Sequence, residues 1–139
     1  MKISARNQLK GIVSNVQEGA VNGVVTIDFG GNAIKADITM DAIKELGLEA
    51  GKEAVAIIKA TNVMFATAKI AGISARNQLA GKVIAVTEGA VNGHVAIELP
   101  DGNRVSGSIT NAAIQELGLA EGQEAVAIVK ATDVIVGVE

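Results

Sequence analysis

The order of apolar and polar residues predicts short strands near the start of the chain. Residues 9–16 mix Leu, Ile and Val with small polar residues, which suits a half-buried strand, and residues 24–29 form a β-branched run. Residues 33–38 predict a third strand. Residues 18–23, which end in Asn22-Gly23, and residues 30–32 separate these runs, and we expect tight turns there because Asn-Gly is a strong hairpin signal.

One short helix is predicted after the third strand. Thr39 suits an N-cap, an acidic residue follows in the first turn, and Gly47 suits the end of the helix. Residues 53–59 then predict a fourth strand and residues 62–65 a fifth. Five short strands with one helix inserted after the third are typical of a small, closed or nearly closed barrel of the OB type.

The whole pattern occurs twice. Residues 4–9 (SARNQL) return letter for letter at 74–79, and residues 18–23 (EGAVNG) return at 88–93. Three later segments (LGL, EAVAI and KAT) return in the same order at 46–48 and 117–119, 53–57 and 124–128, and 59–61 and 130–132. The second copy gains one residue at 99–103, which is expected in a turn because turns tolerate changes of length.

We therefore predict a mostly β protein of two tandem OB-type five-stranded barrels, each with one short helix. The first domain is expected at residues 1–68 and the second at 69–139. Thr110 and Gly118 bound the second helix, and residues 133–136 are its unit's fifth strand. Each unit is near the lower size limit for independent folding, so the two are expected to stabilise each other.

Composition narrows the class of protein. Hydrophobic residues make up 49% of the chain and aromatic residues 1%, so the core consists of Val, Ile, Leu and Ala. No apolar run approaches the ~18 residues of a membrane-spanning helix, and the start shows no secretory pattern. With no cysteine, we expect a cytoplasmic protein without disulfides or a membrane anchor. So apolar a chain is expected to cover part of its surface in an oligomer.

Charge and side-chain chemistry argue against several function classes. The net charge is −3 and aromatic residues are nearly absent, whereas nucleic-acid binders need basic surface and, for single strands, stacking rings. His94 is the only histidine, and neither metal-ligand spacing nor a nucleotide-binding glycine motif is present. We therefore expect no enzyme, no cofactor, no direct metal site and no nucleic-acid partner.

The ordered motifs resemble a known family. SARNQL, GAVNG, IT…LGL and KAT resemble the Mop domain, the molybdate-binding form of the TOBE (transport-associated OB) fold. Two such units at residues 3–67 and 73–138 resemble the two-unit (di-Mop) molbindins of the ModG type. This resemblance implies a cytoplasmic binder of molybdate or tungstate that serves storage, buffering or homeostasis. It also implies a homotrimer with oxyanion sites at subunit and subdomain interfaces.

The resemblance implies two kinds of oxyanion site. The first kind combines the SARN stretch with the lysine of the KAT segment: Ser4, Ala5, Arg6, Asn7 and Lys59, and Ser74, Ala75, Arg76, Asn77 and Lys130. The second kind lies on the trimer axis and involves the EGAVNG turns: Ala20, Val21, Asn22, Ala90, Val91 and Asn92. Four hydroxyls are further candidates, the first and third of which also suit helix caps: Thr39, Thr61, Thr110 and Thr132.

The donor-rich SARN stretch suits a tetrahedral dianion. Molybdate at neutral pH can only accept hydrogen bonds, so its pocket should offer donors alone, whereas hydrogen phosphate carries a proton and needs an acceptor. Three alternatives remain open. The SARN side chains can serve merely to bridge loop carbonyls. The chain can act as an oxyanion-responsive regulatory module on a separate partner protein, or as an OB-type scaffold without a small ligand.

Overall fold

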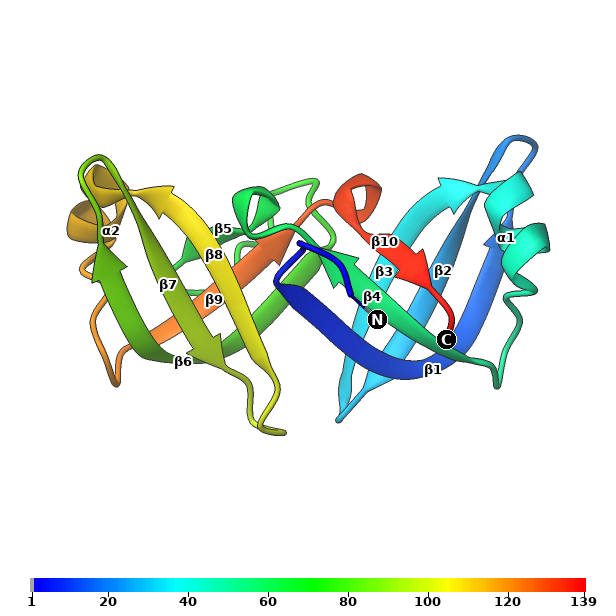
Figure 1. Cartoon of the computed structure of the whole chain (residues 1–139), viewed down its shortest axis with the longest axis horizontal. Helices are drawn as coiled ribbons and strands as arrows, with labels where there is room; N and C mark the ends of the chain where they lie inside the picture. Colours follow the sequence, from blue (N-terminus) through cyan, green and yellow to red (C-terminus); the bar gives the residue numbers. More distant parts are fainter. Residues whose placement is uncertain (1) are drawn as a thin grey trace.

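Two β lobes lie side by side in the computed structural model, which describes residues 2–139 (Figure 1). The first lobe contains β1 (Asn7–Glu18), β2 (Asn22–Phe29), β3 (Asn32–Thr39), α1 (Met40–Leu46) and β4 (Glu53–Ile58). The second contains β6 (Asn77–Glu88), β7 (Asn92–Glu98), β8 (Arg104–Thr110), α2 (Asn111–Leu117) and β9 (Glu124–Val129). The four remaining short elements are η1 (Ala60–Asn62), β5 (Met64–Ala66), η2 (Ala131–Asp133) and β10 (Ile135–Gly137). The predicted fold class, mostly β with one short helix in each unit, is confirmed.

Each lobe receives its fifth strand from the other unit. The sheet orders are β10-β4-β1-β2-β3 and β5-β9-β6-β7-β8, all pairs being antiparallel. Val136 of β10 lies opposite Ala56, and Phe65 of β5 lies opposite Ala127. We expected each barrel to be built from its own five strands. A three-residue edge strand carries too few local contacts to specify which sheet it joins, so this exchange was not visible in the sequence.

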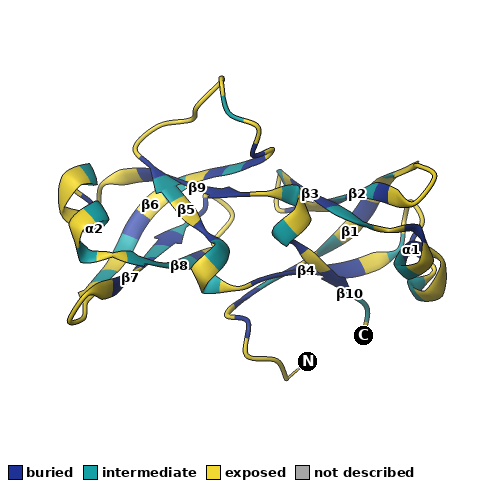
Figure 2. Cartoon of the chain, turned by 90° about the horizontal axis from the view of Figure 1, so that it is seen from above, coloured by how far each residue is buried: buried dark blue, intermediate teal, exposed yellow. Residues whose placement is uncertain are grey.

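The division of the sequence into units 1–68 and 69–139 stays a prediction, and the sheets show how the two units are tied. Buried apolar side chains from both lobes form one continuous cluster that includes Leu9, Ile34, Leu79 and Val105. Figure 2 shows buried residues along the strands, while exposed residues gather in the turns and on the helices. The exchange makes the two units one folded body.

The predicted helix boundaries are confirmed. The Oγ atoms of Thr39 and Thr110 each accept a hydrogen bond from the backbone N–H three residues later, at 3.1 Å. Gly47 and Gly118 close the helices in the left-handed conformation, with φ of 62° and 64°. Both helices lie at the outer ends of the lobes (Figure 1). Among residues 2–139, no helix is long and apolar enough to span a bilayer.

A turn does lie within residues 18–23, as expected, but its Asn22-Gly23 signal is not part of it, because both residues belong to β2 and Gly23 already pairs with Glu18. The turn consists of the three residues before Asn22. Gly23 is required for a different reason: a Cβ there would lie 2.7 Å from Cδ1 of Ile43 and 2.9 Å from Sδ of Met40. Packing of α1 on the hairpin, rather than turn conformation, selects the glycine.

Candidate functional site

Strand pairing brings the two predicted halves of each oxyanion site together, through β1 and β4 in the first lobe and through β6 and β9 in the second. Asn7 lies opposite Ile58, so the SARN stretch leaves the sheet beside the lysine that follows Ile58. Asn77 lies opposite Val129 in the same way. We call Ser4, Ala5, Arg6, Asn7 and Lys59 the first site, and Ser74, Ala75, Arg76, Asn77 and Lys130 the second site. Within each site, both halves come from the same unit of one chain.

The asparagines of the two sites join the lobes. Asn7 is 2% exposed; its Nδ2 donates to Ser106 O at 2.8 Å and to Ile58 O at 3.2 Å, and its Oδ1 accepts from Ser106 N at 2.8 Å. Asn77 is 3% exposed and pairs with N and O of Lys35, both at 2.8 Å. Each amide thus forms hydrogen bonds with both the N–H and the C=O of one residue of the other lobe. Because these groups are engaged, the hydrogen-bond donors free for an anion must come from neighbouring residues.

Each site lies at the junction between the lobes. The η1 turn, which follows Lys59, packs against β8, and the η2 turn, which follows Lys130, packs against β3. Both turns lie in the middle of the molecule in Figure 1. Thr61 and Thr132 belong to these turns and are exposed, so the structure brings two of the four candidate hydroxyls to the first and second sites.

The alanines of the SARN stretches anchor the donors. Ala5 is buried against Val55 and Ile57 on the outer face of β4, and Ala75 is buried in the matching cluster on β9. Ser4 and Arg6 on either side are exposed. The Arg6 guanidinium donates from Nε to Ser4 O at 3.0 Å, and from Nη2 to a second carbonyl of the same segment at 3.2 Å. The buried alanine side chain therefore anchors each SARN stretch to the sheet, while the serine and the arginine beside it remain exposed to solvent.

The cations of both sites have no carboxylate partner. The ion pairs in the described part of the chain are Lys10–Glu139 at 3.3 Å and Arg104–Glu98 at 3.6 Å. Neither involves the arginine or the lysine of the first or second site. An oxyanion can accept charge-assisted hydrogen bonds from an arginine or a lysine that has no carboxylate partner.

The remaining predicted residues form a separate group at the outer ends of the lobes. The carbonyl of Val21 accepts from Met40 N, and that of Val91 from Asn111 N, both at 2.8 Å, so each EGAVNG turn lies on a helix N-terminus. The turn residues are therefore near Thr39 or Thr110, whose hydroxyls already cap those helices. The structure does not bring this group to the first or second site. Val21 and Val91 are 75% and 72% exposed.

Four residues near the sites were not predicted as site residues from the sequence: Ser106, Lys35, Asn62 and Asp133. The first two are brought in by the asparagine amides from the other lobe, and no local pattern points to them. The N–H groups of Asn62 and Asp133 donate to the carbonyls of Lys59 and Lys130, each at 2.9 Å. The signal that could have found this last pair is the change from Asn to Asp at one aligned position.

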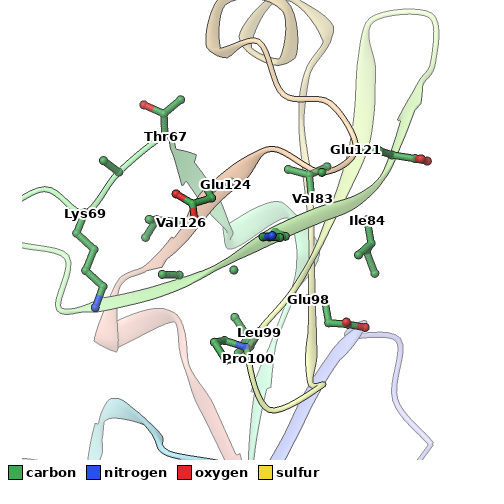
Figure 3. A pocket seen from close by; sticks show the side chains of 16 residues that line it. Thr67, Lys69, Val83, Ile84, Glu98, Leu99, Pro100, Glu121, Glu124 and Val126 are labelled. Atoms are coloured by element: carbon green, nitrogen blue, oxygen red, sulfur yellow. The ribbon is translucent and has the colours of Figure 1, made fainter.

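A hollow of about 920 Å³ lies elsewhere, on the outer face of β6 and β9 (Figure 3). Three carboxylates line it, with two lysines: Glu98, Glu121, Glu124, Lys69 and Lys82. A related hollow of about 690 Å³ lies on the outer face of β1 and β4. Neither lining includes a residue of the first or second site. The carboxylates of the larger hollow disfavour a dianion there.

A protein-family model described as "TOBE domain" matches residues 3–65 and 73–136. The chain belongs to the TOBE family. The two matches coincide with the two copies of the repeat. A 65-residue stretch is 60% identical to a probable molybdenum-pterin-binding protein of Haemophilus influenzae, covering 46% of this chain and 94% of that TOBE relative.

Longer TOBE relatives match both copies at once. The chain is 43% identical over 142 residues to the molybdenum transport protein ModE of Herbaspirillum seropedicae, covering 100% of this chain and 52% of that protein. The chain thus spans about half the length of such relatives. Among solved structures, the cytoplasmic molybdate-binding protein ModG with molybdate bound superposes with a TM-score of 0.96 at 45% identity, covering 100% of both chains.

Proposed function

We propose that this chain binds molybdate, without catalysis, at the first and second sites. The observation that carries the proposal is the likeness to the molybdate-bound ModG structure, which extends over 100% of both chains with a TM-score of 0.96. The structure of this chain adds a physical reason. In the described part of the chain, the arginine and the lysine of each site have no carboxylate partner, and the serine of each site is exposed.

This donor set favours a fully deprotonated oxyanion. Guanidinium, ammonium and hydroxyl groups donate charge-assisted or neutral hydrogen bonds to oxygens that can only accept. The net charge of −3 does not oppose binding, because screened distant charges count for less than contacts inside a junction between lobes. Tungstate has the same charge and shape, so we include it as a ligand.

We also propose a cellular role and an oligomeric state for the protein. We infer storage, buffering or homeostasis of the oxyanion in the cytoplasm, and a homotrimer whose EGAVNG turns form a further kind of site on the axis. The exposed Val21 and Val91 support burial of those turns in an assembly. Light scattering of the purified protein, with and without molybdate, tests the trimer. A monomer under both conditions contradicts it.

A thermal-shift panel of oxyanions, read with a dye because the chain has no Trp or Tyr, tests the binding proposal. Molybdate and tungstate should raise the melting temperature more than sulfate or phosphate does. Calorimetry with the double variant Arg6→Gln/Arg76→Gln should show affinity lowered at least ten-fold, because each site loses a charge-assisted donor of about 1.5–3 kcal/mol. No heat and no shift with molybdate would sink the proposal.

The matched control removes two exposed lysines outside both sites, Lys44→Gln/Lys82→Gln. Lys44 aligns with Gln115 of the second copy, so glutamine suits that helix position. This variant changes the net charge by the same amount as the arginine variant. It should keep the molybdate affinity within about two-fold, because exposed charges contribute little. An equal loss in both variants would mean that overall charge, not the site, controls binding.

A second candidate function is an oxyanion-responsive module that acts on a partner protein. Its support is that the ModE relatives carry this two-unit region as 52% of a longer protein. In this case molybdate should change the surface that a partner recognises. Affinity capture from a cell extract, with and without molybdate, tests it: a partner retained under only one condition favours the module, and identical profiles favour storage.

A further inference from the structure

The first and second sites share a backbone but differ in one side chain. Lys59 and Lys130 have the same φ of −68° and ψ of 139°, and each lysine carbonyl accepts the N–H of the third residue onward at 2.9 Å. That third residue is Asn62 at the first site and Asp133 at the second. The two sites therefore present the same turn with an amide in one and a carboxylate in the other.

This residue lies next to the lysine of its site. Its N–H donates to the lysine carbonyl, so the two residues close one tight turn, in which the lysine itself has an extended backbone. Both side chains are half-buried. In the described part of the chain, neither of the two ion pairs involves Asp133. Asp133 thus adds a carboxylate to the turn that follows Lys130, and no direct salt bridge neutralises it.

The strand facing each site differs as well. The asparagine amide holds Ser106 of β8 at the first site and Lys35 of β3 at the second. Lys35 is held through its backbone N–H and C=O, and the residue is exposed. Asp37, two residues beyond Lys35, accepts from Asn22 at 3.1 Å and is engaged with the hairpin. What distinguishes the second site is therefore the carboxylate of Asp133, which is both a hydrogen-bond acceptor and a negative charge.

We propose that the residue at this position sets the oxyanion selectivity of each site, an inference that rests on the proposed function. With Asn62, the first site admits oxyanions whose oxygens only accept, such as molybdate. With Asp133, the second site also admits a protonated oxyanion, because the P–O–H group of hydrogen phosphate donates to the carboxylate. The same carboxylate repels the molybdate dianion. The two sites of one chain thus differ in affinity for molybdate and in tolerance of phosphate.

Reciprocal exchange of the two side chains tests the proposal. Calorimetry of the full chain with molybdate should resolve two affinity classes, and 10 mM phosphate should compete only with the weaker class. Asp133→Asn should tighten the weaker class about five-fold and remove the competition, while Asn62→Asp should weaken the tighter class about five-fold and create it. About five-fold corresponds to ~1 kcal/mol for a charge near the surface.

The backbone tolerates both exchanges, because each residue already occupies this turn in the other copy. Matched controls add or remove a carboxylate at exposed positions outside the sites: Asn15→Asp and Glu121→Gln. They should leave both affinities and the phosphate competition unchanged. Phosphate competition that both exchange variants leave unchanged overturns the selectivity proposal while molybdate binding stands. Absence of molybdate binding in the unaltered chain overturns the proposed function itself.

Discussion

The two lobes share one fold but differ where each receives its exchanged strand. The second lobe receives Phe65, and Gly107 faces it: a Cβ on Gly107 would lie within 2.4 Å of a ring carbon of Phe65. The first lobe receives the smaller Val136, and the position matching Gly107 is occupied by Ala36, which is fully buried. A large residue thus meets a glycine in one lobe, and a medium residue meets an alanine in the other.

This difference in side-chain size explains how each exchanged strand distinguishes between two nearly identical lobes. In an unexchanged chain, Phe65 would pack where Ala36 carries a methyl, and overfilling a packed site costs about 1–3 kcal/mol. Val136 in the second lobe would leave part of the ring's volume empty beside Gly107. The size match therefore favours the exchanged arrangement and disfavours its alternative.

The largest effect is expected at the asparagines that join the lobes. Asn7→Ala should lower the free energy of unfolding by about 3 kcal/mol, because it leaves buried backbone N–H and C=O groups without partners. Asn77→Ala should cost about 2 kcal/mol, because Asn77 makes two such hydrogen bonds where Asn7 makes three. Urea unfolding followed by far-UV circular dichroism measures both.

The control for this pair is Asn15→Ala, since Asn15 is exposed in β1. It should change the free energy of unfolding by no more than about 0.5 kcal/mol. Equal losses for all three variants would mean that the amide bridges between the lobes contribute no more than surface asparagines do.

A smaller effect is expected from the size match itself. Gly107→Ala should destabilise the chain by about 2 kcal/mol, because its methyl collides with the Phe65 ring. The double variant Gly107→Ala/Phe65→Val copies the first lobe into the second, and about 1 kcal/mol of that loss should return as coupling between the sites. Chemical denaturation of Gly107→Ala, Phe65→Val and the double variant gives the three free energies of unfolding that complete a double-mutant cycle with the unaltered chain. Strict additivity would show that the ring and the glycine do not act together.

The smallest effect is expected from a substitution at the start of the second helix, Asn111→Met. Asn111 occupies the place of Met40, and its Oδ1 is buried without a hydrogen-bond partner, although Nδ2 donates to Gly89 O at 2.8 Å. Asn111→Met should raise the free energy of unfolding by about 0.5 kcal/mol, because removing an unpaired acceptor outweighs one lost hydrogen bond to an exposed turn. The reciprocal Met40→Asn should lower it by about 2 kcal/mol. Thermal unfolding of both variants measures these changes. A loss of stability in Asn111→Met would mean that the unpaired Oδ1 of Asn111 costs less than its hydrogen bond to Gly89 contributes.

Local signals predicted most of the fold. The caps at Thr39 and Thr110, the stops at Gly47 and Gly118 and the β-branched runs all lie where short-range chemistry places them. Asn22-Gly23 misled, because a glycine demanded by helix packing looks the same in sequence as a turn glycine. For the candidate sites, the repeat and the family resemblance singled out the SARN stretch and the lysine. The sequence did not show that the side-chain amides of Asn7 and Asn77 form hydrogen bonds with the backbone of the opposite lobe.

The tandem repeat and the type and order of the elements follow from the amino-acid sequence, because periodicity, capping and repetition are local or linear properties. The pairing of SARN with KAT followed only from the family resemblance. Only the tertiary structure decided which lobe receives β5 and β10, and which backbone each asparagine reads. These choices depend on shape complementarity between residues such as Phe65 and Gly107, which lie far apart in the chain. Two nearly identical copies offer the same local signals, so only packing in three dimensions can distinguish their partners.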